Sequence, residues 1–120
     1  MNDRLIIIPT YNEIENIDAM VRKVFSLPLP FDLLIVDDGS PDGTAQHVRA
    51  LQAEFAGLYL LERRGKLGLG TAYIDGFKWA LARHYAFVFE MDCDFSHNPD
   101  DLLRLYHACA HGETDVAVGS

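Results

Sequence analysis

The sequence lacks the features that mark small disulfide proteins, membrane spans and nucleic-acid binders. It has two cysteines, Cys93 and Cys109, and neither lies in a Cys-x-x-Cys or Cys/His spacing, so we expect reduced thiols in a cytosolic compartment. The N-terminal apolar run covers only residues 5–8, and no run approaches the ~20 apolar residues of a membrane span or suggests a signal peptide. Ten Lys and Arg stand against 18 Asp and Glu, and this net charge of −8 argues against binding to nucleic acid. A phosphate-bearing ligand would need help from a cation.

What is present is a globular composition. The chain has 120 residues, of which 49% are apolar and 23% are charged, close to the average of folded proteins. This length allows one domain at most, so we treat residues 1–120 as a single unit. No internal repeat, linker or low-complexity segment interrupts it.

Short β-rich runs alternate with helical periods along the chain. The apolar runs predict strands at 5–8, 33–36, 58–61, 87–89 and 116–118. Apolar residues at spacings of three and four predict helices over 14–25, 44–55, 71–84 and from Pro99 to about Tyr106. We expect Asn12 to cap the first helix with Glu15 as its capping-box partner, and Thr44 to cap the second.

This alternation predicts an α/β fold of the Rossmann-like kind, a mostly parallel sheet with helices on both faces. The last predicted strand, residues 116–118, would lack a covering helix, so we expect the sequence to be part of a longer domain. In open α/β sheets, ligands bind beyond the carboxyl ends of the strands. Polar residues follow three of the predicted strands, which predicts a common site at that edge.

Asp92 and Asp94 form the sharpest local feature. Residues two apart in an extended segment project to the same side, so both carboxylates can reach one cation, and Mg²⁺ or Mn²⁺ suits such oxygen ligands. The alternative is that the pair only caps the following helix. Its position after a buried strand favours the metal.

The segment 37–44 has two interpretations. Its Asp, Gly, Ser and Pro residues are typical of a plain turn. A turn does not explain why two adjacent carboxylates, Asp37 and Asp38, stand at a buried strand end, because one of them needs hydrogen-bond donors. These donors can be backbone N–H groups, the N–H groups of a base or ribose hydroxyls, so a ligand role for Asp38 stays open.

The glycine-rich segment 65–71 fits neither common phosphate-binding template. A Walker loop needs Ser or Thr where Leu67 stands, and a dinucleotide fingerprint needs Gly where Tyr73 stands. The basic residues of note here are Arg63, Arg64 and Lys66. They either approach an anionic ligand or belong to a plain solvated loop.

Four segments together resemble the family 2 glycosyltransferases, specifically the dolichol- or polyprenol-phosphate mannosyltransferases. They are residues 9–13 (PTYNE), 36–44 (VDDGSPDGT), 66–73 (KLGLGTAY) and 91–97 (MDCDFSH), in the order and spacing of that family. The similarity runs from about Leu5 to Ser120 and covers only the N-terminal, donor-binding half of the family's catalytic domain.

The resemblance implies an A-type glycosyltransferase fold that passes mannose from GDP-mannose to dolichyl or polyprenyl phosphate with inversion, with Mg²⁺ or Mn²⁺. In relatives a longer amide stands at the position of Ser96, and a small residue at that of Cys93. Val36 and Asp38 would contact the guanosine, and the catalytic pair would be Asp92 and Asp94. The implied nucleotide pocket comprises Pro9, Tyr11, Glu13, Val36 and Asp38, and the implied metal and diphosphate site comprises Asp92, the backbone of Cys93, Asp94 and Ser96.

This chemistry fits the absence of a Ser or His catalytic constellation. A lipid phosphate is already anionic, so the reaction needs positioning and stabilisation of the departing diphosphate more than a strong base. The family's acceptor-binding basic residues would follow Ser120, so we expect the 120 residues to bind donor weakly and not to turn over. The expected location is the cytoplasmic face of a membrane, bound peripherally, and a homo-oligomer stays open.

Three other functions are compatible with parts of the sequence. A related family 2 transferase would use another donor, such as UDP-glucose. A non-catalytic nucleotide- or metal-binding module would use the same pocket without transfer. A response-regulator-like domain would explain the acidic strand ends but leaves the segments 9–13 and 66–73 without a role.

Overall fold

The computed structural model describes residues 3–64, 69–91 and 116–118. Strands and helices alternate along them, as the sequence pattern predicts. In chain order the elements are β1 (Arg4–Thr10), α1 (Ile17–Phe25), β2 (Asp32–Asp37), α2 (Thr44–Leu51), β3 (Leu58–Glu62), α3 (Leu69–Ala82), β4 (Phe87–Glu90) and β5 (Val116–Val118).

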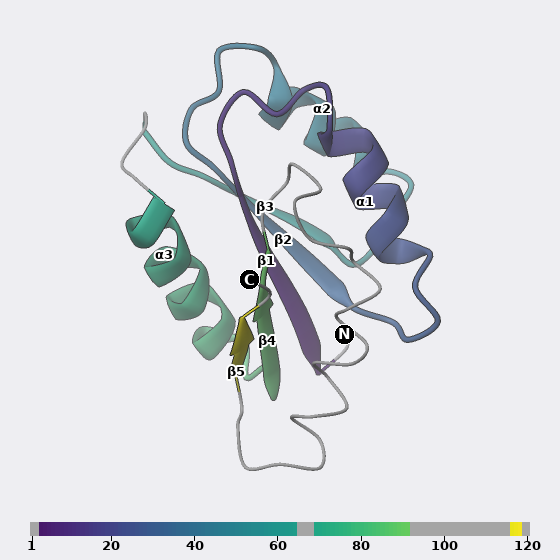
Figure 1. Ribbon diagram of the computed structural model, residues 1–120, viewed down its shortest axis with the longest axis vertical. Coiled ribbons are helices and arrows are strands. Elements are labelled where there is room, and N and C mark those ends of the chain that lie inside the picture. The colour runs from purple at the N-terminus through teal and green to yellow at the C-terminus, as the bar shows by residue number, and fades with distance from the viewer. Residues whose placement is uncertain (1–2, 65–68, 92–115, 119–120) are drawn as a thin grey trace.

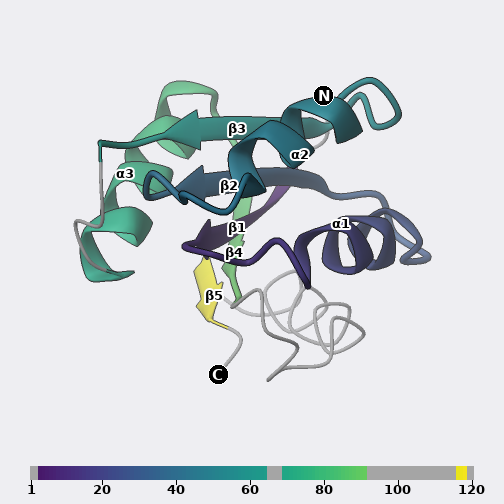
Figure 2. The ribbon, with the colours of Figure 1, turned by 90° about the horizontal axis from the view of Figure 1, so that it is seen from above.

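The strands form one five-stranded sheet in the order β3-β2-β1-β4-β5 (Figure 2), and neighbouring strands run parallel. The first strand of the chain therefore lies in the middle, between β2 and β4. This placement explains its sequence, because a central parallel strand is buried on both faces and Ile6, Ile7 and Ile8 are fully buried. The predicted α/β class is confirmed.

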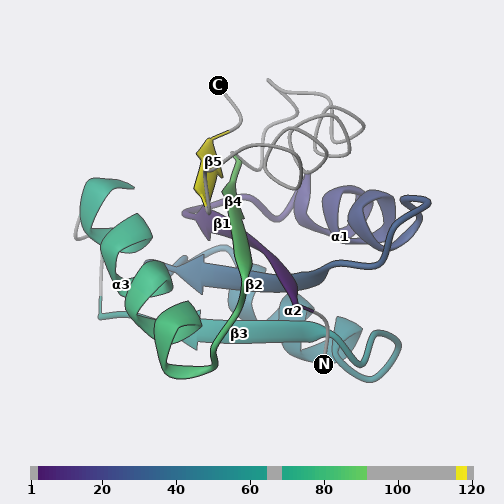
Figure 3. The same ribbon diagram turned by 90° about the horizontal axis from the view of Figure 1, so that it is seen from below.

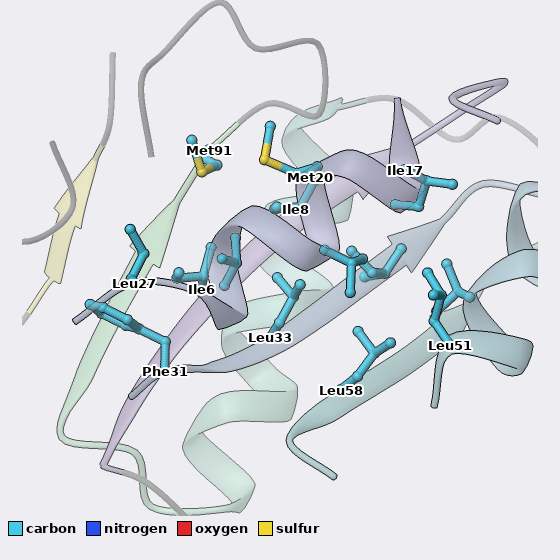
Figure 4. Close-up of a cluster of buried hydrophobic side chains, with 14 of the residues drawn as sticks. Ile6, Ile8, Ile17, Met20, Leu27, Phe31, Leu33, Leu51, Leu58 and Met91 are labelled. Carbon is cyan, nitrogen blue, oxygen red and sulfur yellow. The ribbon is translucent and has the colours of Figure 1, made fainter. Parts of the chain in front are cut away.

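Helices cover both faces of the sheet, with α1 and α2 on one side and α3 on the other (Figures 1 and 3). Alternate residues of each central strand face opposite helices. Ile6, Ile8 and Leu33 pack against α1 and α2, as Figure 4 shows. Leu5 and Ile7 join the core under α3. The strict alternation sets the register of the sheet, because a slip of one residue would exchange the two cores.

The strand β1 is longer than the sequence predicts. It continues through Pro9 to Thr10, and Pro9 pairs with Val36 of β2. Pairing with β4 covers only Arg4 to Ile7, so Pro9 lies where β1 is paired on one side. A residue without an N–H is tolerated at such an edge-like position.

The predicted cap of the first helix is wrong. The helix α1 begins at Ile17 with Asn16 as its N-cap residue, and no side chain caps it. Asn12 instead has a positive φ of 56°, and its N–H donates to Ser40 Oγ at 2.9 Å. A tertiary contact thus takes the place of the expected capping box.

The second helix also starts differently. Its N-cap residue is Gly43, at φ 93°, and Thr44 is the first helical residue. The predicted end is wrong too, because α2 stops at Leu51. Phe55 lies beyond the helix and stacks on Phe25 of α1, with ring centroids 4.8 Å apart.

The helix predicted from Pro99 lies outside the described residues. Among the residues that the structure describes, no helix is both long enough and apolar enough to cross a bilayer.

Candidate functional site

The carboxyl ends of β1, β2 and β3 meet at one edge of the sheet. Thr10 is paired with Asp37 in the register of β1 and β2. The N–H of Arg63, the residue after β3, donates to the carbonyl of Asp37 at 2.8 Å. The segments that leave β1 and β2 lie together at the top of Figure 1. This is the edge at which the sequence predicts a site.

Asp37 is the structural member of the acidic pair. It is 1% exposed, and its carboxylate accepts hydrogen bonds from Thr10 Oγ1 at 2.7 Å, the Ser40 N–H at 2.9 Å and Ser40 Oγ at 2.7 Å. Donors within the protein therefore compensate the buried charge. Asp37 links the end of β1 to the turn that follows β2.

Backbone N–H groups of the loop after β1 are held by side chains of the loop after β2. The N–H of Glu13 donates to Thr44 Oγ1 at 3.1 Å, and the N–H of Ile14 donates to Asp42 Oδ2 at 3.1 Å. With the bond from Asn12 to Ser40, these contacts join residues 12–14 to residues 40–44. We call this set of contacts the loop clasp; it builds one wall of the site.

The Asp42 carboxylate has a lowered pKa within the clasp. Burial raises this pKa, but hydrogen bonds from the Thr44 hydroxyl and from the N–H groups of Ile14 and Thr44 outweigh that effect. Thr44 Oγ1 donates to Asp42 Oδ1 at 2.5 Å. The ionised form of Asp42 therefore stabilises the clasp.

Asp38 has a different partner from Asp37. Arg63 donates to it through two nitrogens, from Nε to Oδ1 at 2.6 Å and from Nη2 to Oδ2 at 2.9 Å. Both side chains are nearly buried, with 4% of Arg63 and 8% of Asp38 exposed. Such a two-point pair fixes the plane of the carboxylate as well as its position. One of the donors that the acidic pair needs is thus a basic residue of this chain.

Arg63 also contacts α3. Its Nη1 donates to Thr71 Oγ1 and to Asp75 Oδ2, both at 3.0 Å. The pKa of Arg63 is raised, chiefly by its hydrogen bond with Asp38, against the opposing effect of burial. The guanidinium therefore connects the end of β2 with α3 and stays charged.

The structure places the described members of the predicted nucleotide pocket around this edge. Tyr11 and Glu13 lie in the loop after β1, and Tyr11 is 36% exposed. Pro9 and Val36 are paired across β1 and β2, and Asp38 follows β2 directly. Val36 is fully buried, with its side chain in the core under α3, so in this structure it presents no surface to a ligand.

The predicted metal and diphosphate residues lie outside the described residues. They are Asp92, Cys93, Asp94 and Ser96. The N–H of Met91, the residue before them, donates to the carbonyl of Ile7 at 3.1 Å, so Met91 itself lies beside β1. Within residues 3–64 and 69–91, no group of three or more His, Cys, Asp or Glu residues could hold a metal ion.

A cavity of about 440 Å³ lies at the opposite edge of the sheet. It is lined by residues from the end of α1, the start of β2 and the connection between α2 and β3, including Phe25, Phe31 and Phe55. The candidate site is instead the edge that holds Asp38 and Arg63, because ligands of parallel α/β sheets bind at the carboxyl ends of the strands.

Sequence reasoning missed the role of Arg63. It treats this residue as part of a basic cluster with Arg64 and Lys66. The pair could have been predicted from the strand order. In that order β3 lies beside β2 with Glu62 opposite Asp37, so the next residues, Arg63 and Asp38, are neighbours. The sequence alone does not state that order.

Comparison with known proteins gives matches over nearly the whole chain. The model of the glycosyl transferase family 2 matches residues 5–120. The chain is 45% identical over 117 residues to a polyprenol monophosphomannose synthase of Mycolicibacterium smegmatis, which covers 97% of this chain and 44% of that protein. It is 44% identical over 116 residues to an undecaprenyl-phosphate mannosyltransferase of Micrococcus luteus, covering 97% of this chain and 47% of that protein. The chain thus spans less than half the length of these curated relatives.

Solved structures show the same fold. A mannosyltransferase from Pyrobaculum calidifontis, solved with GDP-Man and Mn²⁺, has a TM-score of 0.71 and 26% identity, covering 84% of this chain and 30% of that one. TarS of S. aureus, solved with UDP, has a TM-score of 0.74 and 25% identity, covering 92% of this chain and 33% of that one. The expected A-type glycosyltransferase fold is confirmed. Because the family model matches all but the first four residues, this chain belongs to glycosyl transferase family 2.

Proposed function

We propose that residues 1–120 are the nucleotide-sugar-binding part of a single glycosyltransferase domain that moves mannose from GDP-mannose to polyprenyl or dolichyl phosphate with inversion. The observation that carries the proposal is Asp38, held by Arg63 at the carboxyl edge beside the loop clasp. Two relatives support the sugar and the acceptor class: a polyprenol monophosphomannose synthase at 45% identity and an undecaprenyl-phosphate mannosyltransferase at 44%.

Asp38 suits the recognition of a nucleobase. A carboxylate offers about four lone-pair sites, and Arg63 takes one on each oxygen, so acceptor capacity is left for the N–H groups of a base. Guanine presents two neighbouring N–H donors. In this proposal Asp38 contacts the guanosine, while Pro9, Tyr11 and Glu13 line the pocket.

Asp92 and Asp94 would hold a divalent cation, Mg²⁺ or Mn²⁺, with Ser96 and the backbone of Cys93 nearby. Their carboxylates are the hard oxygen ligands that these cations prefer, and Met91, the residue before Asp92, lies beside β1. Bound there, the cation would neutralise the charge of the departing diphosphate. The Mn²⁺ beside GDP-Man in the structural neighbour supports this class of cofactor.

The acceptor chemistry needs little from protein bases. An oxygen of the lipid phosphate attacks the anomeric carbon of the mannose, and the bond from that carbon to the diphosphate breaks with its electron pair leaving on GDP. Inversion follows from attack on the face opposite the leaving group. Because the acceptor is anchored in a bilayer, we place the protein at a membrane surface, on the cytoplasmic face where GDP-mannose would reach it.

Nucleotide titration tests this proposal. We expect the protein to bind GDP more tightly than UDP in the presence of Mn²⁺, measured by calorimetry, and to transfer labelled mannose to a polyprenyl phosphate when complete. Replacing Asp94 with Asn should reduce transfer at least about 100-fold, because loss of a metal ligand should cost no less than the about 10- to 100-fold lost with a group that only orients a ligand. Preference for UDP would instead indicate a transferase with another donor, such as UDP-glucose.

A control variant and the unaltered protein complete this test. Glu54→Gln changes a carboxylate at the opposite edge of the sheet and should leave transfer as it is. Unchanged transfer by the Asp94→Asn protein would contradict the assigned metal role. Nucleotide binding without any transfer by the unaltered complete protein would favour a non-catalytic module.

A further inference from the structure

Arg63 is the meeting point of two carboxylates from different elements. Its Nε and Nη2 face Asp38 at the end of β2, and its Nη1 faces Asp75 in α3 at 3.0 Å. Thr71, one turn before Asp75, accepts a further bond from Nη1. The guanidinium is planar and rigid, so the contact on one side constrains the orientation of the other.

The two carboxylates differ in their exposure to water. The side chain of Asp38 is 8% exposed, whereas that of Asp75 is 42% exposed. An exposed ion pair contributes little to the free energy of unfolding. Water therefore screens Asp75 more than Asp38, so the bond from Arg63 to Asp75 adds less to stability while it still helps to hold the guanidinium in place.

The helix α3 does not need this bond in order to stay in place. It packs on the sheet through Ala72 and Ala80, which are buried, and through Gly76, which lies directly against Ile7. Because α3 is held firmly on the sheet, Asp75 keeps a fixed position beside Arg63.

We propose that Asp75, supported by Thr71, is a positioning residue that sets the orientation of the Asp38 carboxylate through Arg63 and so determines selectivity for the nucleobase. This inference rests on the proposed role of Asp38 in contacting guanosine. Guanine offers two neighbouring N–H donors and uracil offers one between its carbonyls, so a carboxylate that turns loses more contact with GDP than with UDP.

The chain contains a matched control for this arrangement. Arg22 also bridges two carboxylates, Asp18 at 2.7 Å and Glu54 at 2.9 Å, and Glu54 is 53% exposed. Glu54 lies at the opposite edge of the sheet, where it lines the cavity. Glu54→Ala therefore removes the exposed partner of a bridging arginine without touching the candidate site.

The experiment compares Asp75→Ala, Asp75→Asn and Glu54→Ala in the complete protein. Calorimetry with Mn²⁺ present gives the Kd for GDP and for UDP, and thermal unfolding gives the Tm. We expect Asp75→Ala to weaken GDP binding about 5-fold, within the range of couplings carried by indirect contacts, and to weaken UDP binding less. Asp75→Asn keeps a neutral acceptor and should recover part of the GDP affinity. Glu54→Ala should bind both nucleotides as the unaltered protein does.

Several results would overturn the inference. One is unchanged affinity for both nucleotides in Asp75→Ala. Another is an equal loss for GDP and UDP, which would indicate general loosening of the pocket, and a third is a loss of the same size in Glu54→Ala. If the unaltered protein binds no GDP, the proposed function itself fails and the positioning role fails with it, which is a distinct outcome.

Discussion

At the residue scale, the two glycines of α3, Gly70 and Gly76, differ in the space that surrounds them. A Cβ on Gly76 would lie 2.8 Å from Ile7 Cγ2, closer than packed atoms approach, and would lie 3.0 Å from Ile7 Cδ1, which is a tight contact. A Cβ on Gly70 would meet nothing within 4 Å. Gly76 therefore lets the helix approach the central strand, whereas Gly70 has no such packing role.

Replacing each glycine with Ala tests this difference. We expect Gly76→Ala to lower the free energy of unfolding by about 1–3 kcal/mol, because buried Ile7 must shift to make room. Gly70→Ala should be neutral or stabilising by up to about 1 kcal/mol, because Ala is the better helix former. Urea unfolding of both variants measures this. Equal effects would mean that the contact between Gly76 and Ile7 does not limit the packing of α3.

At the element scale, the loop clasp replaces the helix caps that local sequence rules predict. Asn12 was expected to cap α1, but its N–H binds Ser40 of the next loop. Thr44 was expected to cap α2, but its hydroxyl accepts from Glu13 and donates to Asp42. Groups that could cap their own helices instead bind the neighbouring loop, and these bonds join the two loops of the site.

The clasp should depend on pH through Asp42. Its pKa is lower in the folded protein than the ordinary 3.8, so the unfolded chain takes up the proton first as pH falls. The stabilisation from the ionised carboxylate is therefore complete above about pH 4 and is lost as pH falls through the folded pKa. Because Asp42 is exposed, we expect at most about 1 kcal/mol.

The measurement compares the Tm of the unaltered protein with that of Asp42→Asn, which keeps an acceptor oxygen but does not titrate. We expect the unaltered protein to be the more stable at neutral pH and the difference in Tm to shrink as the pH falls below about 4. A difference in Tm that stays constant with pH would show that the charge of Asp42 does not contribute.

At the scale of the whole molecule, strand order decides which residues share the site. The central position of β1 places the loops after β1 and β2 side by side, and β3 adds Arg63 from the outer side. The strand β4 lies on the other flank of β1 and leads to Met91. The excess negative charge of the sequence is partly balanced here, because Arg63 faces both Asp38 and Asp75.

A ligand that binds only the folded molecule should stabilise all of it. Following the proposed function, GDP with Mn²⁺ at one hundred times its Kd should raise the free energy of unfolding by about 2.7 kcal/mol. A thermal shift assay detects this as a higher Tm, and a chelator should remove most of the gain. An equal gain with GDP in the presence of the chelator would contradict the cation's role in binding.

Much of the fold could be predicted from the sequence because its signals are local. The run Leu5 to Ile8 indicates a buried strand wherever it stands, and the five predicted strands all appear, most of them one residue or two longer than expected. The candidate edge could be predicted as well, because parallel strands with polar ends must gather them on one side. The starts of the first two helices could not be predicted. Side chains distant in the sequence bind the groups that local rules assign to helix caps, as Ser40 binds the N–H of Asn12.

The class of fold, the burial of the central strands and the family follow from the amino-acid sequence, because hydrophobic period and ordered motifs are properties of the chain alone. The partners of the acidic pair depend on the folded arrangement: Asp37 accepts its hydrogen bonds from Thr10 and Ser40, whereas Asp38 is paired with Arg63 and, through it, linked to Asp75. Those partners lie 25 and 12 residues from Arg63 along the chain for Asp38 and Asp75. Contacts at such separations depend on strand order and helix docking, which local patterns do not encode.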